Sequence, residues 1–293
     1  MPAAAQEPYS PHGRVRRLME ALPDDPPPCR REAISACLWR RVLVDSIASF
    51  LLTALTSSPK STVGGNLEAS AALGASAAAL TYCLPSDMNP AVTLSRLVTR
   101  RVSVLSAALC ICAQCVAACA GATAVYGLTP VAERRRFADA MRFRFADGLH
   151  ASQAFGAEFL GSVLVVLVTL AVADDEGSRR SCCPVGLAYA AASLSAYRFT
   201  GAGLNPARSL GPALVANCWD GHWVYWVGPM LAGLMAAFTH EYTRSTRLKT
   251  RQVVQEHLAV QCSVQPGNHV KRGASRPSND TELTVTSNND CRV

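Results

Sequence analysis

Two stretches of this sequence decide its fold: Met-Asn-Pro-Ala-Val-Thr-Leu at residues 88–94 and Gly-Ala-Gly-Leu-Asn-Pro-Ala-Arg-Ser at residues 201–209. Asparagine is a favoured N-cap, and proline fits the first helical position because its missing N–H would have no partner there. A helix is therefore predicted to start at each copy of the tripeptide, over about 90–98 and 206–214. Both segments are too short to cross a bilayer. The two copies are Asn89, Pro90, Ala91 and Asn205, Pro206, Ala207.

The surroundings of the tripeptide are also repeated. A carboxylate followed four residues later by a serine occurs at Asp45 and Ser49 and again at Glu158 and Ser162, at a similar distance before each Asn-Pro-Ala. One unit therefore occurs twice, at about residues 38–126 and 153–242. Each unit has an odd number of apolar spans, so the second copy is inverted in the membrane. Transporters and channels built this way have their sites near the bilayer midplane.

Composition agrees with a membrane protein. The 293 residues are 49% hydrophobic and only 17% charged, whereas soluble proteins carry about 25% charged residues. We expect an all-α membrane protein with six transmembrane helices plus two re-entrant half-helices in an inverted repeat. The channel domain is predicted at 38–242, with polar tails at 1–37 and 243–293. The predicted spans are 38–57, 66–84, 102–126, 153–173, 184–203 and 222–242.

Arginine and lysine residues predict the orientation. They gather before the first span, between the second and third, between the fourth and fifth, and after the sixth, which places both termini in the cytoplasm by the positive-inside rule. The loop at 127–152 argues against this orientation because it carries five arginines. Trp219, Trp223 and Trp226 lie where the sixth span would enter the outer interface, as aromatic belts do.

The repeats also suggest chemistry. Two half-helices entering from opposite faces would bring Asn89 and Asn205 together, and each side-chain amide can donate to a water oxygen. The helix N-termini add partial positive charge, so a proton or cation meets a barrier. A secondary transporter and an intramembrane enzyme find little support, because no metal motif or nucleophile pair lies in the spans. No catalytic residue, metal, cofactor or nucleic-acid partner is expected.

The two Asn-Pro-Ala stretches, with Ala113-Gln114 and Tyr-Trp-Val-Gly-Pro at 225–229, resemble the signature sequences of the aquaporins, the major intrinsic proteins. The resemblance covers about residues 38–242. It implies a homotetramer with one pore per subunit, in a lipid bilayer and most simply the plasma membrane. It also implies that Asp45 and Glu158 accept hydrogen bonds from the re-entrant loops, and that Arg208 belongs to the outer selectivity constriction.

The remaining constriction positions differ from the water-selective pattern. By the same resemblance they are Leu73, Ser193 and Ala202, and Ser193 stands where water-selective members have histidine. This ring is wider and less polar, so glycerol or urea can be expected to pass with water. Against this, Ser209 stands where glycerol channels have aspartate. Asp87 replaces a histidine common at the inner mouth and is either a solvated loop charge or an influence on gating.

Three functions remain open at this point. The first is a passive water channel that excludes protons and ions and also passes small neutral solutes. The second is a channel primarily for glycerol or urea. The third is a membrane adhesion or signalling protein that kept the scaffold and lost conduction.

Overall fold

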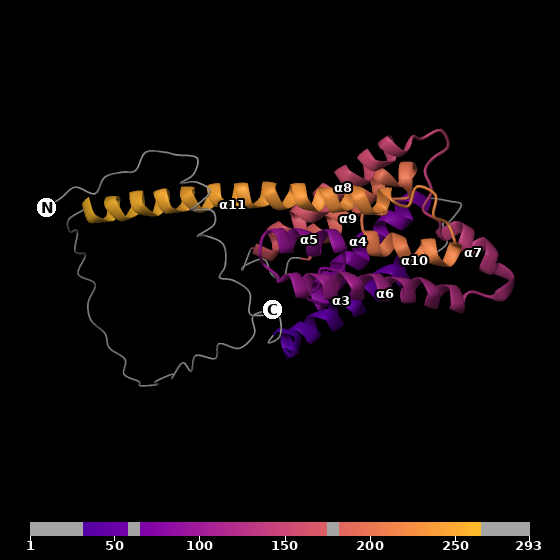
Figure 1. Cartoon of the computed structure of the whole chain (residues 1–293). Helices are drawn as coiled ribbons and strands as arrows, with labels where there is room; N and C mark the ends of the chain where they lie inside the picture. Colours follow the sequence, from indigo (N-terminus) through magenta and orange to yellow (C-terminus); the bar gives the residue numbers. More distant parts are fainter. Residues whose placement is uncertain (1–31, 58–64, 175–181, 265–293) are drawn as a thin grey trace, which may run out of the picture. The chain divides into compact units, whose positions relative to one another are not determined.

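The computed structural model describes residues 32–57, 65–174 and 182–264 (Figure 1). Most of the predicted tails, 1–37 and 243–293, therefore lies outside the described residues. Contacts divide the chain into two units, Met1–Glu241 and Tyr242–Val293. The functional residues predicted from the sequence all belong to the first unit.

The described residues form helices and no strand, which confirms the all-α fold class. The first repeat comprises α3 (Ala36–Thr56), α4 (Gly65–Cys83), α5 (Pro90–Val98) and α6 (Val104–Leu128). The second repeats this order as α8 (Ala151–Asp174), α9 (Cys183–Thr200), α10 (Pro206–Ala216) and α11 (Val224–Val264). Figure 1 shows the short helices α5 and α10 lying among the long ones.

Two segments differ from the prediction. The loop at 127–152 contains a short 3-10 turn, η1 (Val131–Glu133), followed by the helix α7 (Arg134–Met141). The sixth long helix, α11, does not end near residue 242 but continues to Val264. No glycine or proline occurs between Leu234 and Gln265, so a polar sequence can extend the apolar helix without a breaker.

Small residues set the helix packing. The main helix pairs are α3 with α6 and α4 with α9. At the second crossing Gly74 faces Gly186: a Cβ on Gly186 would lie 2.6 Å from the Gly74 carbonyl oxygen and 2.6 Å from the Ala78 Cβ. The backbones therefore approach as closely as small-residue membrane interfaces allow. Each half-helix also contacts the first helix of the other repeat, α5 with α8 and α10 with α3.

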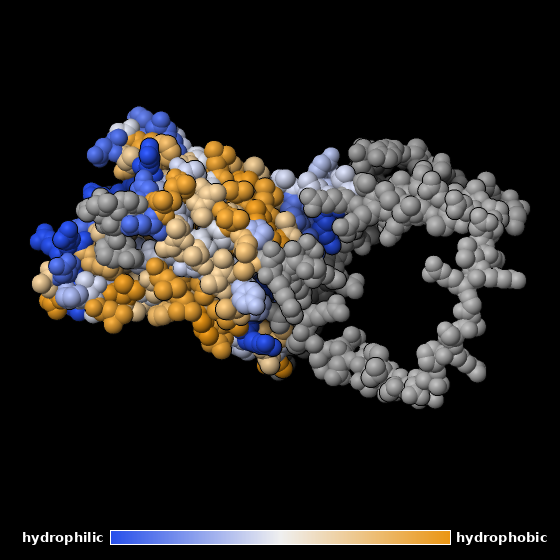
Figure 2. Space-filling model, turned by 180° about the vertical axis from the view of Figure 1, so that it is seen from behind, coloured by the Kyte–Doolittle hydropathy of each residue, from blue (hydrophilic) through white to orange (hydrophobic). Residues whose placement is uncertain are grey.

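The outer surface is apolar around the body of the helices. On the face that Figure 2 shows, hydrophobic residues cover the middle of the described surface, and hydrophilic residues gather toward its two ends, more of them at the left. Two described helices, α6 and α8, are long and apolar enough to cross a membrane by composition alone. Exposed large hydrophobic residues also occur on the other long helices, among them Leu43, Leu55, Leu187, Leu194, Leu231 and Phe238.

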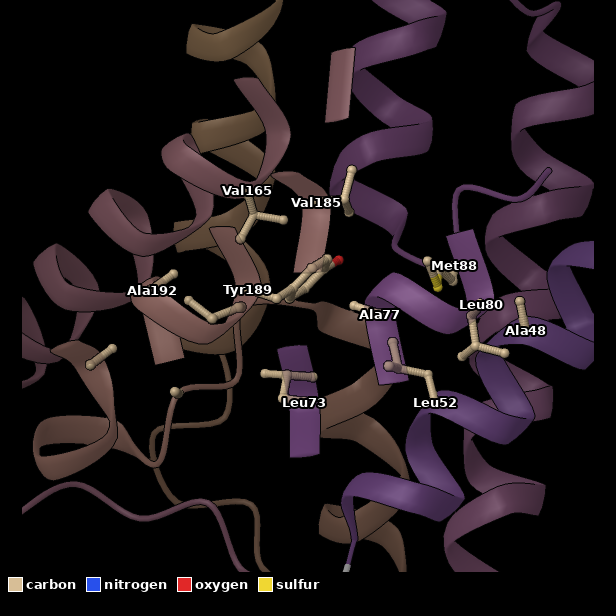
Figure 3. Close-up of a cluster of buried hydrophobic side chains, with 13 residues drawn as sticks. Ala48, Leu52, Leu73, Ala77, Leu80, Met88, Val165, Val185, Tyr189 and Ala192 are labelled. Carbon is tan, nitrogen blue, oxygen red and sulfur yellow. The ribbon is translucent and has the colours of Figure 1, made fainter. Parts of the chain in front are cut away.

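The largest buried cluster lies between the two repeats. It combines residues of α3 and α4 with residues of α8 and α9 and of the loops before both half-helices. Figure 3 shows Tyr189 in the middle of this cluster, among Val165, Val185, Leu73 and Ala77. The cluster therefore occupies the position where an inverted repeat places its site.

Candidate functional site

Each Asn-Pro-Ala tripeptide caps its half-helix. The Asn89 side-chain oxygen accepts from the Ala91 N–H at 2.9 Å, and that of Asn205 accepts from the N–H groups of Ala207 and Arg208 at 3.0 and 3.3 Å. Both asparagines have extended backbone and are followed by proline at the start of the helix. The local sequence therefore fixes both helix starts, as N-cap chemistry predicts.

The two tripeptides meet through reciprocal hydrogen bonds. The Asn89 amide donates to the Leu204 carbonyl at 3.1 Å, and the Asn205 amide donates to the Met88 carbonyl at 2.7 Å. Met88 and Leu204 each precede the asparagine and share a left-handed backbone, with φ of +43° and +55°. Non-glycine residues adopt this conformation uncommonly, so its occurrence in both loops extends the repeat from sequence to backbone geometry.

Buried carboxylates hold the loops that precede the half-helices. Asp45 Oδ1 accepts from the N–H groups of Asp87 and Met88 at 2.8 and 3.4 Å. Glu158 accepts from the N–H groups of Gly203 and Leu204 at 2.9 and 2.7 Å, one on each carboxylate oxygen. Both carboxylates are fully buried. These bonds give partners to backbone groups that would otherwise be costly to bury.

Arg208 lies at the start of α10, and only 5% of its surface is exposed. One guanidinium nitrogen donates to the carbonyls of Ala202 and Gly203 at 2.6 and 3.1 Å, and Nε donates to the Thr56 hydroxyl at 3.0 Å. The Phe143 ring lies 5.1 Å from the guanidinium carbon. The cation is therefore fixed by three acceptors and one aromatic face, an arrangement suited to holding a charge in an apolar site.

A cavity of about 180 Å³ opens beside Arg208. Its lining includes Ala69 and Ala72 of α4, Tyr197 of α9 and Phe143 of the connecting loop. Among the four predicted constriction residues Arg208 is part of this lining. The other lining positions were not predicted from the sequence as constriction residues.

The other three predicted constriction residues lie elsewhere. Leu73 is fully buried in the central cluster. Ser193 is 1% exposed and its hydroxyl accepts from Ser70 at 3.0 Å. Ala202 is fully buried and presents its carbonyl oxygen to Arg208. Their part in selecting solutes stays a prediction.

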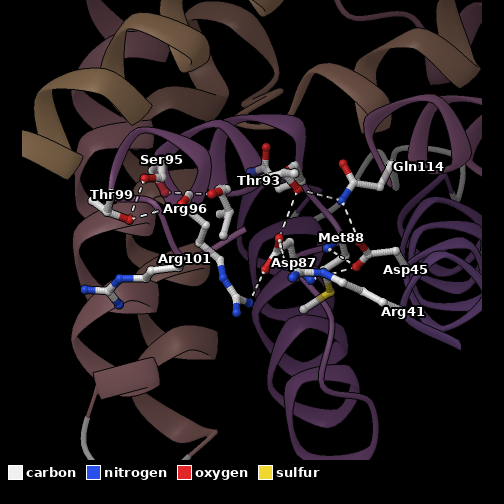
Figure 4. A network of polar contacts seen from close by, with 12 residues as sticks. Arg41, Asp45, Asp87, Met88, Thr93, Ser95, Arg96, Thr99, Arg101 and Gln114 are labelled. Atoms are coloured by element: carbon white, nitrogen blue, oxygen red, sulfur yellow. Dashed lines mark hydrogen bonds and ion pairs between the residues drawn. The ribbon is translucent and has the colours of Figure 1, made fainter. Parts of the chain in front are cut away.

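Asp87, in the loop between α4 and α5, forms a polar network with residues of α3 and α5 (Figure 4). Its carboxylate contacts Arg41 of α3 at 3.0 Å and Arg96 of α5 at 2.7 Å, and accepts from the Thr93 hydroxyl at 3.1 Å. Asp87 is only 4% exposed, so the interpretation as a solvated loop charge is wrong. The physical reason is that two arginines and a hydroxyl replace the water which a buried carboxylate loses.

Tyr189 on α9 is a further residue of the site that was not predicted from the sequence. Its hydroxyl accepts from the Asn89 amide at 3.1 Å, and the residue is 1% exposed. One signal was available: Tyr189 lies four residues before Ser193, which places both on one helix face.

Comparison with known proteins agrees with this geometry. The family model described as "Major intrinsic protein" matches residues 31–240. The lens fiber major intrinsic protein of Gallus gallus is 32% identical over 78% of this chain and 90% of its own length. Aquaporin-1 of Homo sapiens is 30% identical over 71% of this chain and 83% of its own length.

Two further similarities support less: one relative is matched over only part of its length, and one solved structure has a low sequence identity. The neurogenic protein big brain of Drosophila melanogaster is 34% identical over 80% of this chain, but the chain spans only 35% of that protein. The solved structure of the aquaglyceroporin from Plasmodium falciparum has a TM-score of 0.59 at 19% identity, covering 68% of this chain and 94% of its own. At that identity the likeness shows the fold alone.

Proposed function

Because this chain belongs to the major intrinsic protein family, whose members are membrane channels for water or small solutes rather than enzymes, we propose that it is a passive water channel that excludes protons and ions. One observation carries the proposal: the side-chain amides of Asn89 and Asn205 meet where the N-termini of two half-helices converge. The Asn205 amide has a second N–H that it can donate to a passing oxygen, and the Asn89 amide can do the same when its bond to the Tyr189 hydroxyl opens.

Charge explains the exclusion of protons and cations. Each half-helix contributes about half a positive charge at its N-terminus, and the two N-termini face the same point. Arg208 adds a full positive charge beside the outer cavity. A water molecule can satisfy the amide donors with its oxygen, whereas a cation meets repulsion at both places.

The α4 side of the cavity supports a broader solute range. Four residues of this helix line it, and three of them, Gly65, Ala69 and Ala72, carry at most a methyl group, whereas the fourth is Glu68. We propose that glycerol and urea pass together with water. Added or missing groups in such a site shift discrimination by only about 1–3 kcal/mol, so the range is to be measured as permeability ratios.

The test is osmotic swelling of proteoliposomes that contain the full-length chain, with water, glycerol and urea compared by stopped flow. An Ala72→Trp substitution adds a large ring to the wall of the cavity without removing a hydrogen bond, and we expect it to abolish the protein-dependent flux. Leu160→Trp is the matched control, because Leu160 is 68% exposed on α8 and outside that lining. Equal protein-dependent fluxes in wild type and Ala72→Trp would contradict the proposed channel function.

Orientation and assembly complete the proposed function. We place both termini in the cytoplasm from the arginine distribution of the sequence. We place the protein in the plasma membrane from its resemblance to the aquaporins. A homotetramer with one pore per subunit is consistent with the large exposed apolar side chains on the long helices. Proteolysis of sealed vesicles tests the orientation, since both termini must be cut from the same side.

A second candidate function is a membrane signalling or adhesion protein without conduction. It is favoured by the 34% identity to a protein named neurogenic, and by the full burial of Asn89. Absence of protein-dependent flux in folded wild-type protein, for all three solutes, would favour this candidate over the channel.

A further inference from the structure

Tyr189 lies in the buried cluster where the two repeats meet. Its side chain extends from α9 into the cluster formed by both repeats, and Figure 3 shows the ring among Val165, Val185, Leu73 and Ala77. The hydroxyl accepts from the Asn89 amide at 3.1 Å. A packing tyrosine at a helix interface would direct its polar end to any available carbonyl, but this one meets the amide that should face the solute.

The hydrogen bonds of the two asparagines are therefore unequal. A side-chain amide has two N–H donors. Asn89 uses both, one on the Leu204 carbonyl and one on the Tyr189 hydroxyl. Asn205 uses one on the Met88 carbonyl, and among the described residues its second N–H has no acceptor. A solute at the midplane thus finds one free amide donor instead of two.

Burial of the same residues indicates that the midplane is closed. Asn89 is 0% exposed, Asn205 1% and Tyr189 1%, so water does not reach them in this conformation. The outer side differs, because the cavity beside Arg208 is open. The closed region therefore contains Tyr189 and the two asparagines, and the cavity beside Arg208 lies outside it.

We propose that Tyr189 is the permeability-determining residue of this channel: its ring closes the path at the midplane, and its hydroxyl takes the Asn89 donor that a solute would use. The inference rests on the proposed channel function. A solute passes only when the ring moves aside and its hydrogen bond to Asn89 breaks. The wild-type protein therefore conducts slowly, and both steps contribute to the barrier.

Replacing the ring separates this role from simple packing. In Tyr189→Val the space left by the ring and hydroxyl is bordered by the Asn89 amide, which loses its acceptor, and we expect water to enter and take that hydrogen bond. In Tyr189→Phe the ring remains and only the hydrogen bond is lost. A packing role predicts loss of stability in both variants with no gain of flux in either.

The experiment measures water permeability per reconstituted protein for the full-length wild type, Tyr189→Val and Tyr189→Phe. We expect about a tenfold increase in Tyr189→Val, since passage no longer requires ring displacement and breakage of a hydrogen bond, and a smaller increase in Tyr189→Phe. Tyr82→Val is the matched control, because Tyr82 is 66% exposed on α4, and it should leave the flux unchanged. Tyr189→Thr serves as a second opened variant if gel filtration shows that the valine variant aggregates.

The outcomes distinguish the proposed role of Tyr189 from the proposed channel function on which it rests. If wild type conducts, Ala72→Trp blocks it, and the opened variants conduct no faster than wild type, the role of Tyr189 is overturned and the channel stands. If neither wild type nor a folded opened variant exceeds protein-free vesicles, both are overturned.

Discussion

At the scale of single residues, two buried carboxylates do the same task with different chemistry. Glu158 reaches two backbone N–H groups with separate oxygens and also accepts from the Thr200 hydroxyl. Asp45, one methylene shorter, takes its two backbone N–H groups on one oxygen and accepts from the Gln114 amide with the other, at 3.2 Å. In each case several donors offset the cost of burying a charge.

The hydrogen bonds that Glu158 accepts predict the effect of Glu158→Gln. The glutamine amide has one acceptor oxygen where the carboxylate has two, so one buried N–H of the second loop loses its partner. We expect a destabilisation of about 1–3 kcal/mol, seen as a lower unfolding temperature in detergent. Glu68→Gln, at an exposed position of α4, is the control and should not change it. An unchanged unfolding temperature in Glu158→Gln would contradict the role of the carboxylate.

At the scale of elements, the two half-helices are held by different contacts. Ion pairs of an aspartate hold the loop before α5, whereas hydrogen bonds of an arginine within α10 hold the second half-helix. Asp87, just before α5, is paired with Arg41 of α3 and Arg96 of α5. In α10 the equivalent tie is Arg208, which bonds the loop before the helix and Thr56 of α3. The two repeats share a backbone design, but the polar contacts that hold their two half-helices differ.

The close crossing of α4 and α9 predicts that Gly186 is required. An alanine Cβ there would lie 2.6 Å from the Gly74 carbonyl oxygen, and the obstacle is backbone that cannot rotate away. We expect Gly186→Ala to destabilise the protein by about 1–3 kcal/mol, as overpacking does. Thermal unfolding in detergent measures the change.

Gly156 of α8 provides the matched control, because a Cβ there would have no neighbour within 4 Å. Alanine is about 1 kcal/mol better than glycine inside a helix, so Gly156→Ala should be neutral or stabilising. If both variants behave alike, close packing at the crossing is not what requires glycine.

At the scale of the whole molecule, large apolar side chains remain exposed on helices of both repeats, including Leu43, Leu160, Leu187 and Phe238. Soluble monomers rarely expose extended apolar surfaces. Lipid covers such a surface in a membrane protein, and neighbouring subunits cover part of it in an oligomer. The apolar band in Figure 2 is thus the part of the molecule that meets the bilayer and, we propose, three other subunits.

The proposed assembly gives a mass prediction. Native mass spectrometry of the full-length protein in a mild detergent should show four chains of 31.1 kDa each, because each subunit alone leaves its apolar faces uncovered. Denaturation in strong detergent should return the single chain and serves as the control. A monomer as the dominant species in every mild detergent would contradict the tetramer.

Local signals made the helices predictable. The two Asn-Pro-Ala caps, the apolar lengths and the paired carboxylates lie in short stretches of sequence, and the structure has α5 and α10 beginning at Pro90 and Pro206 as those signals predict. The end of α11 was missed because the continuing segment is polar but contains no helix breaker. Helix α7 was missed because the loop has no apolar run.

The class of fold, the two half-helices and the residues that cap them could be predicted from the sequence, because capping and span length are local properties of the chain. Which side chains lie beside Arg208 and Asn89 follows from the tertiary structure alone. Ala69, Phe143, Tyr197 and Tyr189 come from three separate parts of the chain. Which side chains share a space depends on helix rotation and crossing, and these follow from packing across the whole bundle.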